Sequence, residues 1–234
     1  MNSLKLCGFQ KTTLLDYPGY VACTLFLGGC NFRCPFCHNS GILDGSADES
    51  ITMEELMDFL KKRKGILEGI CITGGEPTLH PLPLFRLMDQ IKPLGYRIKL
   101  DTNGSRPDIL KQLCTDGLID YVAMDIKAGR PHYGKVCGLD EFLLAPIDQS
   151  VQWLKEGHIP FEFRTTVVKG LHDIDDFNDI SLWLAGDSPY YLQEFVPSRQ
   201  VPDKNLTAVS SNEMELFLAA AKRFLPNARI RGIV

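Results

Sequence analysis

The 234-residue chain is long enough for one α/β domain, and its net charge of -4 leaves no excess of basic residues to neutralise a phosphate backbone. We therefore expect no nucleic-acid partner. No segment approaches the roughly 20 apolar residues that span a bilayer, and the N-terminus lacks a signal-peptide pattern, so we expect no membrane partner and a cytoplasmic location. Eight cysteines are too sparse for a disulfide scaffold, but three of them lie within eight positions, which suggests metal in a reducing compartment.

Short apolar runs alternate with amphipathic helical patterns along the whole chain. Strands are expected over 21–28, 69–73, 96–101, 121–125, 161–168, 191–196 and 229–234. Helices are expected over 52–62, which opens with a capping box of Thr52 and Glu55, and over 83–92, 106–114, 147–155, 175–185 and 212–224. The order predicts a single domain over 1–234, with a lead-in over 1–20, parallel βα units over 21–197 and a C-terminal helix and strand over 198–234.

Clusters of glycine, proline, cysteine or polar residues lie at the ends of most of the predicted strands, at 28–30, 73–77, 101–104, 125–127 and 196–197. The carboxyl ends of parallel strands are where α/β folds place their sites. An open sheet concentrates its site at one switch point, whereas here nearly every strand contributes. We therefore expect an open, partial (β/α)6 TIM-like barrel of about six βα units.

The cysteines Cys30, Cys34 and Cys37 have the spacing Cys-x3-Cys-x2-Cys. Three thiolates from one loop can hold a cubane iron–sulfur cluster and leave its fourth iron open as a binding site. Two other interpretations remain open: a zinc site with His38 as fourth ligand, or three thiols without a metal.

This loop, with Phe36 just before the last cysteine, resembles the signature of radical S-adenosylmethionine enzymes. The resemblance implies a [4Fe-4S] cluster whose open iron chelates S-adenosylmethionine, and a 5′-deoxyadenosyl radical that abstracts a hydrogen atom; no further catalytic side chain is implied. The segment 73–77 is similar to the Gly-Gly-Glu-Pro motif of that family. It implies that the backbone of Gly74 and Gly75 and the carboxylate of Glu76 meet the amino group of the cofactor.

Three further segments resemble one branch of the family, the activating enzymes of glycyl radical enzymes. They are Asp-Tyr-Pro-Gly at 16–19, Asp-Thr-Asn-Gly at 101–104 and Asp-Ile-Lys at 125–127. The stretch 8–19 is most similar to anaerobic ribonucleoside-triphosphate reductase activating proteins, and the later motifs are also similar to pyruvate formate-lyase activating enzyme. The resemblance implies a glycyl radical enzyme as protein substrate and flavodoxin or ferredoxin as electron donor.

The same resemblance implies roles for charged residues at the ends of the strands. Asp101, Thr102 and Asp125, with a carbonyl near Ala123, would hold a monovalent cation beside the cofactor carboxylate. Lys127 would be a positive contact there, and Arg164 would hold the carboxylate. Alternatively, the two aspartates cap helices and the two basic residues are surface charges.

The other cysteines have no ligand spacing and are expected to be small buried hydrophobes; they are Cys7, Cys23, Cys71, Cys114 and Cys137. Cys137, in the loop 134–138, is the one whose role stays open. Residues 38–70 contain no cysteine, so one cluster is expected. His172 is expected at the surface. The run Asp173, Asp175, Asp176 is expected to be a solvated helix start.

Two alternatives to glycyl radical activation remain. One is a radical enzyme acting on a small molecule or peptide, such as a carboxy-deazaguanine synthase or a peptide maturase. The other is a non-catalytic iron–sulfur or zinc regulatory module, which would not need Gly74, Asp101 or Lys127.

Overall fold

The computed structural model describes residues 5–232, and within them eight strands form one sheet in the order β1-β2-β3-β4-β5-β6-β7-β8. The pair β1–β2 is antiparallel, and every later pair is parallel. The strands are β1 Leu6–Thr13, β2 Ala22–Leu27, β3 Gly69–Gly74, β4 Arg97–Thr102, β5 Tyr121–Asp125, β6 Phe161–Val167, β7 Tyr190–Glu194 and β8 Ala228–Arg231.

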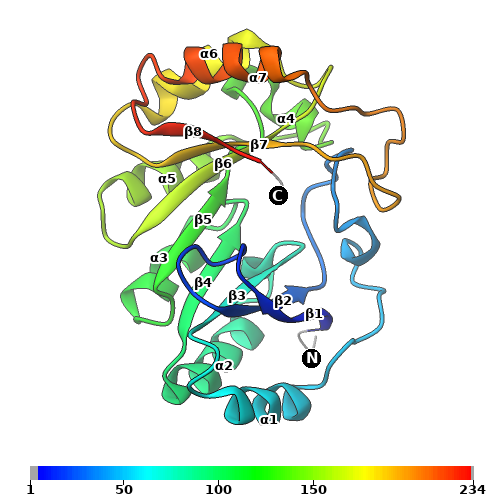
Figure 1. Ribbon diagram of the computed structural model, residues 1–234, viewed down its shortest axis with the longest axis vertical. Coiled ribbons are helices and arrows are strands. Elements are labelled where there is room, and N and C mark those ends of the chain that lie inside the picture. The colour runs from blue at the N-terminus through cyan, green and yellow to red at the C-terminus, as the bar shows by residue number, and fades with distance from the viewer. Residues whose placement is uncertain (1–4, 233–234) are drawn as a thin grey trace.

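Helices follow the parallel strands and lie along the outer side of the curved sheet (Figure 1). They are α1 Met53–Arg63, α2 Pro81–Ile91, α3 Pro107–Thr115, α4 Tyr133–Val136, α5 Ala145–Lys155, α6 Ile174–Leu184 and α7 Ser211–Ala221. Short 3-10 turns occupy Ser40–Ile42, Pro77–Leu79, Lys92–Leu94 and Arg130–His132. The expected capping box of Thr52 and Glu55 is present at the start of α1.

The expected open partial barrel is confirmed, because β1 and β8 stand at the two edges of the described sheet and do not pair with each other. Strand β1 was not predicted. Within it only Leu6 and Thr13 are buried, so its sequence lacks the alternation that identifies a strand. The last predicted strand is present over Ala228–Arg231, and residues 233–234 of that prediction lie outside the described residues.

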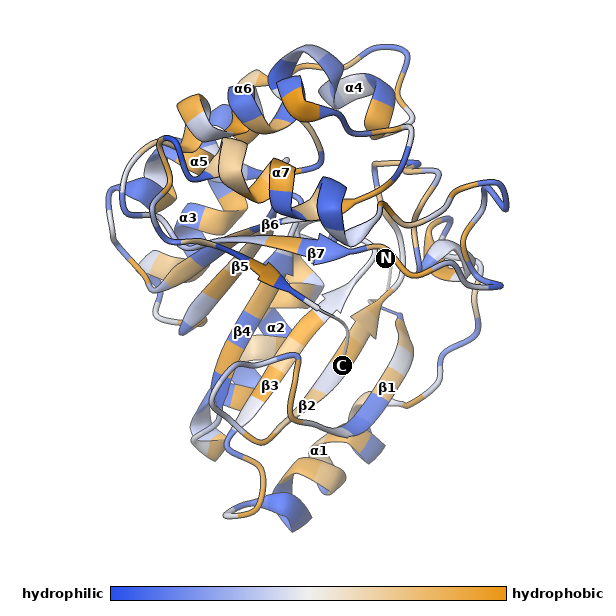
Figure 2. Ribbon diagram, turned by 45° about the horizontal axis from the view of Figure 1, so that its top comes forward, coloured by the Kyte–Doolittle hydropathy of each residue, from blue (hydrophilic) through white to orange (hydrophobic). Residues whose placement is uncertain are grey.

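The two faces of the central strands differ in chemistry. Hydrophobic residues gather along β2 and β3 (Figure 2), and strand residues such as Leu25, Ile72 and Leu100 are fully buried in the core. The opposite face carries charge, since Lys99 and Asp101 are two positions apart on β4 and form an ion pair. The concave interior of the barrel is therefore polar at its carboxyl end.

Neither expected aspartate cap is observed. The N-cap of α3 is Arg106, and the N-cap of the 3-10 turn after β5 is Gly129. Neither Asp101 nor Asp125 therefore caps these elements. Among the described residues, no helix has the length and apolar character to cross a membrane.

Candidate cluster and cofactor site

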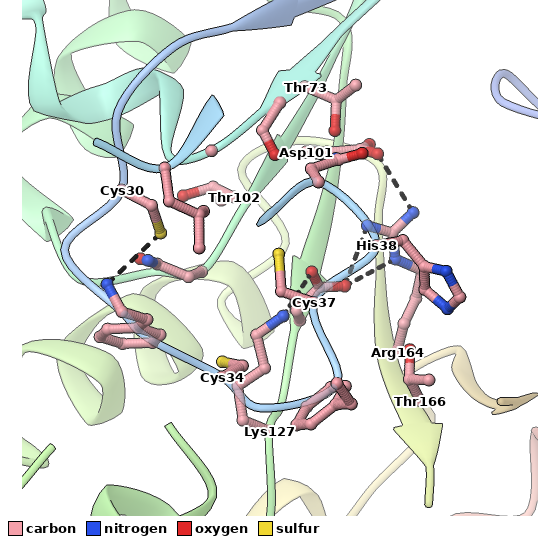
Figure 3. A pocket seen from close by; sticks show the side chains of 18 of the residues that line it. Cys30, Cys34, Cys37, His38, Thr73, Asp101, Thr102, Lys127, Arg164 and Thr166 are labelled. Atoms are coloured by element: carbon pink, nitrogen blue, oxygen red, sulfur yellow. Dashed lines mark hydrogen bonds and ion pairs between the residues drawn. The ribbon is translucent and has the colours of Figure 1, made fainter. Parts of the chain in front are cut away.

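The three cysteines of the Cys-x3-Cys-x2-Cys motif lie on the loop that follows β2, and all three line one pocket at the carboxyl ends of the strands (Figure 3). Backbone bonds shape the loop: Gly29 N–H donates to the carbonyl of Ile42 at 2.7 Å, and Cys30 N–H donates to that of Leu43 at 3.0 Å. Gly29 has φ 91°, a conformation that favours glycine. The sequence thus bends the chain tightly just before its first cysteine.

Two distant segments hold this loop from outside. Arg33 N–H donates to the carbonyl of Cys137 at 2.8 Å, and a Cβ on Gly138 would lie 2.3 Å from the carbonyl oxygen of Arg33. On the other side, Asp203 N–H donates to the carbonyl of Pro35 at 3.0 Å, and the Ser40 hydroxyl bonds to that of Gln200. The cysteine loop is therefore held in place by segments that lie about a hundred residues or more further along the sequence.

The arrangement of the cysteines distinguishes a cluster from a single zinc ion. Sulfur atoms on one tetrahedral zinc lie about 4 Å apart, because each Zn–S bond is about 2.3 Å. Within the described residues, the one group of three metal-ligating side chains whose atoms lie within 4.8 Å of one another is His132, Asp173 and Asp176, which contains no cysteine. The three cysteine sulfurs form no such tight group, which argues against a single zinc ion held by all three. His38, the expected fourth zinc ligand, packs its ring 5.5 Å from that of Phe195.

Cys34 differs from its two neighbours in acidity. A hydrogen bond from Cys137 and the nearby Lys127 lower the pKa of Cys34 to about 7, despite its burial. Burial raises the pKa of Cys30 to about 12 and also raises that of Cys37. Because the thiolate is the ligand form, Cys34 is the thiol most ready to bind iron. Cys137 is fully buried, as expected, but its thiol also forms this hydrogen bond with Cys34.

The Gly-Gly pair at the end of β3 lets two strand ends touch through their backbones. Gly75 N–H donates to the carbonyl of Leu27 at 2.9 Å, and Glu76 N–H donates to that of Gly29 at 2.7 Å. A Cβ on Gly75 would lie 2.0 Å from the Gly29 oxygen, and Gly74 has φ 126°. Only glycine fits at these two positions, which join the cofactor motif to the cysteine loop.

Glu76 does not line the pocket, contrary to the role that the resemblance implied. Its side chain is fully buried, and its carboxylate accepts bonds from Thr78 N–H, Thr78 Oγ1, Thr102 Oγ1 and Asn103 N–H. Burial raises its pKa, while these donors oppose the rise. The carboxylate faces inward and ties the end of β3 to the end of β4.

Replacing Glu76 with alanine is therefore expected to destabilise the fold by about 3 kcal/mol, because it removes a buried acceptor and leaves its hydrogen-bond donors without a partner. The exposed Glu54 on α1 provides a control, and Glu54→Ala should change stability by less than about 0.5 kcal/mol. Urea unfolding of the cluster-free proteins measures both. A Glu76→Ala protein of unchanged stability that loses only cofactor affinity would restore the contact role.

Five charged residues form a continuous network beside the cysteines. Arg164 on β6 bridges the two aspartates, with its guanidinium 2.9 Å from Asp125 and 3.3 Å from Asp101. Lys127 lies 2.9 Å from Asp125, and Lys99 pairs with Asp101 from inside the barrel. Burial would raise the pKa of Asp125, but Arg164 and Lys127 outweigh it, so that the pKa falls to about 2. Lys127 and Arg164 are thus not surface charges.

The pocket brings together most of the residues proposed from sequence, namely Cys30, Cys34, Phe36, Cys37, Gly74, Gly75, Asp101, Thr102, Asp125, Lys127 and Arg164. Sequence reasoning gave no role to Asn39, nor to Asn103 within the 101–104 motif, and it did not select Thr166 or Gln193; all four also line the pocket. The rule that sites form at the carboxyl ends of strands could have found Thr166 and Gln193, near the ends of β6 and β7. The pair 196–197 that the same rule selected does not line the pocket.

The surface prediction for His172 is wrong. The side chain is 6% exposed, with its Nδ1 accepting from Val168 N–H at 3.0 Å and its Nε2 2.7 Å from the carbonyl of Lys127. The tautomer with the proton on Nε2 satisfies both bonds. Its ring centre is 6.3 Å from that of Phe36, so His172 supports the backbone of Lys127 and the cysteine loop.

The acidic run beside it is only partly solvated. Asp173 caps α6 in a capping box with Asp176, and Asp175 is exposed, as expected for a helix start. Asp176 is buried and accepts from Gly129 N–H at 3.0 Å. That bond connects α6 to the loop after β5 and corrects the prediction for this residue.

Comparison with known proteins identifies the family. The radical SAM superfamily pattern matches residues 24–184, and the chain belongs to this superfamily. It is 32% identical over 234 residues to a protein of Methanocaldococcus jannaschii assigned as a glycyl-radical enzyme activating enzyme, covering 97% of this chain and 95% of that one. It is 29% identical to the pyruvate formate-lyase-activating enzyme of Clostridium pasteurianum over 172 residues, which cover 67% of this chain and 69% of that one.

Two other comparisons concern a shorter sequence match and a solved structure. The 7-carboxy-7-deazaguanine synthase of Hyperthermus butylicus is 36% identical over 91 residues, which cover 39% of this chain and 38% of that one. The solved structure of anSMEcpe with bound AdoMet and the Kp18Cys peptide superposes with a TM-score of 0.62 at 18% identity, covering 87% of this chain and 61% of that one. That likeness supports the fold.

Membership of the superfamily gives the cofactors, a [4Fe-4S] cluster and S-adenosylmethionine. The residues present fit both. Three cysteines from one loop line the pocket and would supply three thiolate ligands, which would leave one iron for the cofactor. The guanidinium of Arg164 and the ammonium of Lys127 lie in the same pocket and suit a carboxylate.

Proposed function

We propose that this radical SAM enzyme activates a glycyl radical enzyme by abstracting a hydrogen atom from a backbone glycine of that partner. The proposal is carried by the near full-length similarity to the activating enzyme of M. jannaschii. It is supported by the pocket that joins the cysteine loop to the charged ends of β4, β5 and β6. The similarity to the deazaguanine synthase covers less than half of either chain.

When bound, the cluster and S-adenosylmethionine supply an electron and the radical that removes the hydrogen atom. The chain holds and orients them. Cys30, Cys34 and Cys37 bind the cluster, and Arg164 and Lys127 bind the cofactor carboxylate. The backbone at Gly74 and Gly75 would meet the amino group, a role left to the backbone because Glu76 is fully engaged elsewhere. Phe36 would pack against the bound cofactor from the cysteine loop.

The proposal also includes the finer assignment. The stretch 8–19 supports an anaerobic ribonucleoside-triphosphate reductase as the partner, and flavodoxin or ferredoxin would supply the electron. No described side chain in the pocket is needed as an acid or base, because hydrogen-atom abstraction transfers a proton and an electron together.

A labelling experiment tests the proposal. The reduced, cluster-loaded enzyme is incubated with S-adenosylmethionine and a partner whose target glycine carries deuterium on its α-carbon. We expect deuterium in 5′-deoxyadenosine and a glycyl radical signal by electron paramagnetic resonance. A partner with Gly→Ala at that position should transfer far less, because a side chain crowds the approach. Label that moves from a small metabolite, and from no glycyl radical enzyme of the host, would support the small-molecule alternative.

A further inference from the structure

Lys99 is a buried lysine that the sequence analysis did not select. It lies on β4 between Ile98 and Leu100, and its side chain is 1% exposed. Its ammonium pairs with one carboxylate oxygen of Asp101 and lies 3.8 Å from the sulfur of Cys71. Lysine is almost never fully buried unless it is paired, so Lys99 and Asp101 must be considered together.

The oxygen ligands expected for a monovalent cation are already committed to other partners. Asp101 accepts from Lys99 on one oxygen and from Arg164 on the other. Asp125 likewise accepts from Arg164 on one oxygen and from Lys127 on the other. Each of the four carboxylate oxygens therefore receives a cationic donor.

The third expected ligand is committed as well. The Thr102 hydroxyl donates to Glu76 at 2.8 Å and accepts from Gly104 N–H at 3.1 Å. A cation at this place would compete with bonds that Asp101, Thr102 and Asp125 already make. The donor set therefore does not fit the monovalent cation that the family resemblance implied.

The balance of charge points the same way. In the network of Lys99, Asp101, Asp125, Lys127 and Arg164, three cationic side chains face two carboxylates. An added cation would increase the positive surplus of these five side chains, which is unfavourable. A carboxylate placed against Arg164 and Lys127 would offset it locally, and S-adenosylmethionine carries one beside its positive ammonium and sulfonium groups.

We propose that the ammonium of Lys99 takes the place of a monovalent cation, so that this enzyme binds S-adenosylmethionine without K⁺ or Na⁺. Lys99 is a positioning residue: it neutralises Asp101 from inside the barrel and leaves Arg164 and Lys127 to hold the cofactor carboxylate. This inference rests on the proposed cofactor site and is independent of which partner is activated.

The test measures cofactor binding by the cluster-loaded protein without any partner. The affinity for S-adenosylmethionine is determined anaerobically by equilibrium dialysis, and in parallel from the change it causes in the electron paramagnetic resonance of the reduced cluster. Buffers of equal ionic strength contain tetramethylammonium, K⁺ or Na⁺ as the cation. We expect the affinity of the unaltered protein to agree within about twofold in all three. A gain of about tenfold or more in K⁺ or Na⁺ would overturn the proposal.

Two variants show whether Lys99 is the reason. Lys99→Met keeps the length and removes the charge, and it should bind the cofactor about ten- to a hundredfold more weakly in tetramethylammonium. K⁺ or Na⁺ should restore part of that loss. Lys99→Arg keeps the charge and should show no such response. A Lys99→Met protein with full affinity and no response to cations would exclude the role of Lys99.

The outcomes remain distinct if a variant fails to load its cluster, because the unaltered protein alone then decides whether the cation is needed. If the unaltered, cluster-loaded protein binds no S-adenosylmethionine in any buffer, the proposed function fails and this inference fails with it. Cofactor binding without glycyl radical formation would instead contradict only the choice of partner.

Discussion

Replacing Cys34 with alanine is expected to lower the iron content of the reconstituted protein from about four per chain to near zero, because two thiolates cannot retain a cubane. The same loss is expected for Cys30→Ala and Cys37→Ala, because each change also leaves two thiolates. Reductive cleavage of S-adenosylmethionine should fall to background. Iron analysis and the visible absorption of the cluster measure the effect after anaerobic reconstitution.

The matched control for Cys34→Ala is Cys114→Ala, the same chemical change on the half-buried surface of α3. It should retain about four irons per chain. A Cys34→Ala protein that still holds a full cluster, or a Cys114→Ala protein that loses it, would show that the ligand set is wrongly assigned. Stoichiometric zinc in the unaltered protein, with no reconstitutable cluster, would also contradict the assignment.

Replacing Gly75 with alanine is expected to destabilise the cluster-free protein by about 3 kcal/mol or more, near the upper end of overpacking costs. The added Cβ would lie 2.0 Å from the oxygen and 2.6 Å from the carbon of the Gly29 carbonyl. Both are backbone atoms, so no change of rotamer relieves the clash. Since Gly29 precedes Cys30, separation of the two strand ends should also reduce cluster loading.

Gly41 provides the control for the clash, because a Cβ there would have no heavy atom within 4 Å and its φ is not positive. Gly41→Ala should change the free energy of unfolding by less than about 0.5 kcal/mol. It should also keep the full iron content. Urea unfolding and iron analysis compare the two variants. Equal stability of Gly75→Ala and the unaltered protein would show that the ends of β2 and β3 are not held this closely.

The sequence predicts the parallel strands and the cysteine loop well because their signals are local. Apolar runs of strand length, and three cysteines in eight positions, can be recognised without knowledge of distant contacts. Edge strand β1 was missed because most of its residues are exposed or half-buried. Its pairing with β2 depends on the sheet and not on its own pattern.

The errors at individual residues have a different cause, namely partners far away in the chain. Glu76 was assigned to the cofactor, but its carboxylate accepts hydrogen bonds from Thr102 and Asn103. His172 was placed at the surface, but it bonds to the carbonyl of Lys127, 45 positions earlier. Lys99 could have been noticed, since a lysine between two apolar residues of a parallel strand is buried on either face of the sheet.

The bonds that fasten the cysteine loop have a consequence for the order of biosynthesis. The three cysteines leave the ribosome early, but Arg33 N–H awaits the carbonyl of Cys137, and the carbonyl of Pro35 awaits the amide of Asp203. Such distant pairings form late, when the intervening chain has been made and folded. Iron delivered to the nascent chain would meet an unformed loop. Cluster insertion is therefore a post-translational step of a nearly complete fold, and truncation before Asp203 should impair it even though every ligand is present.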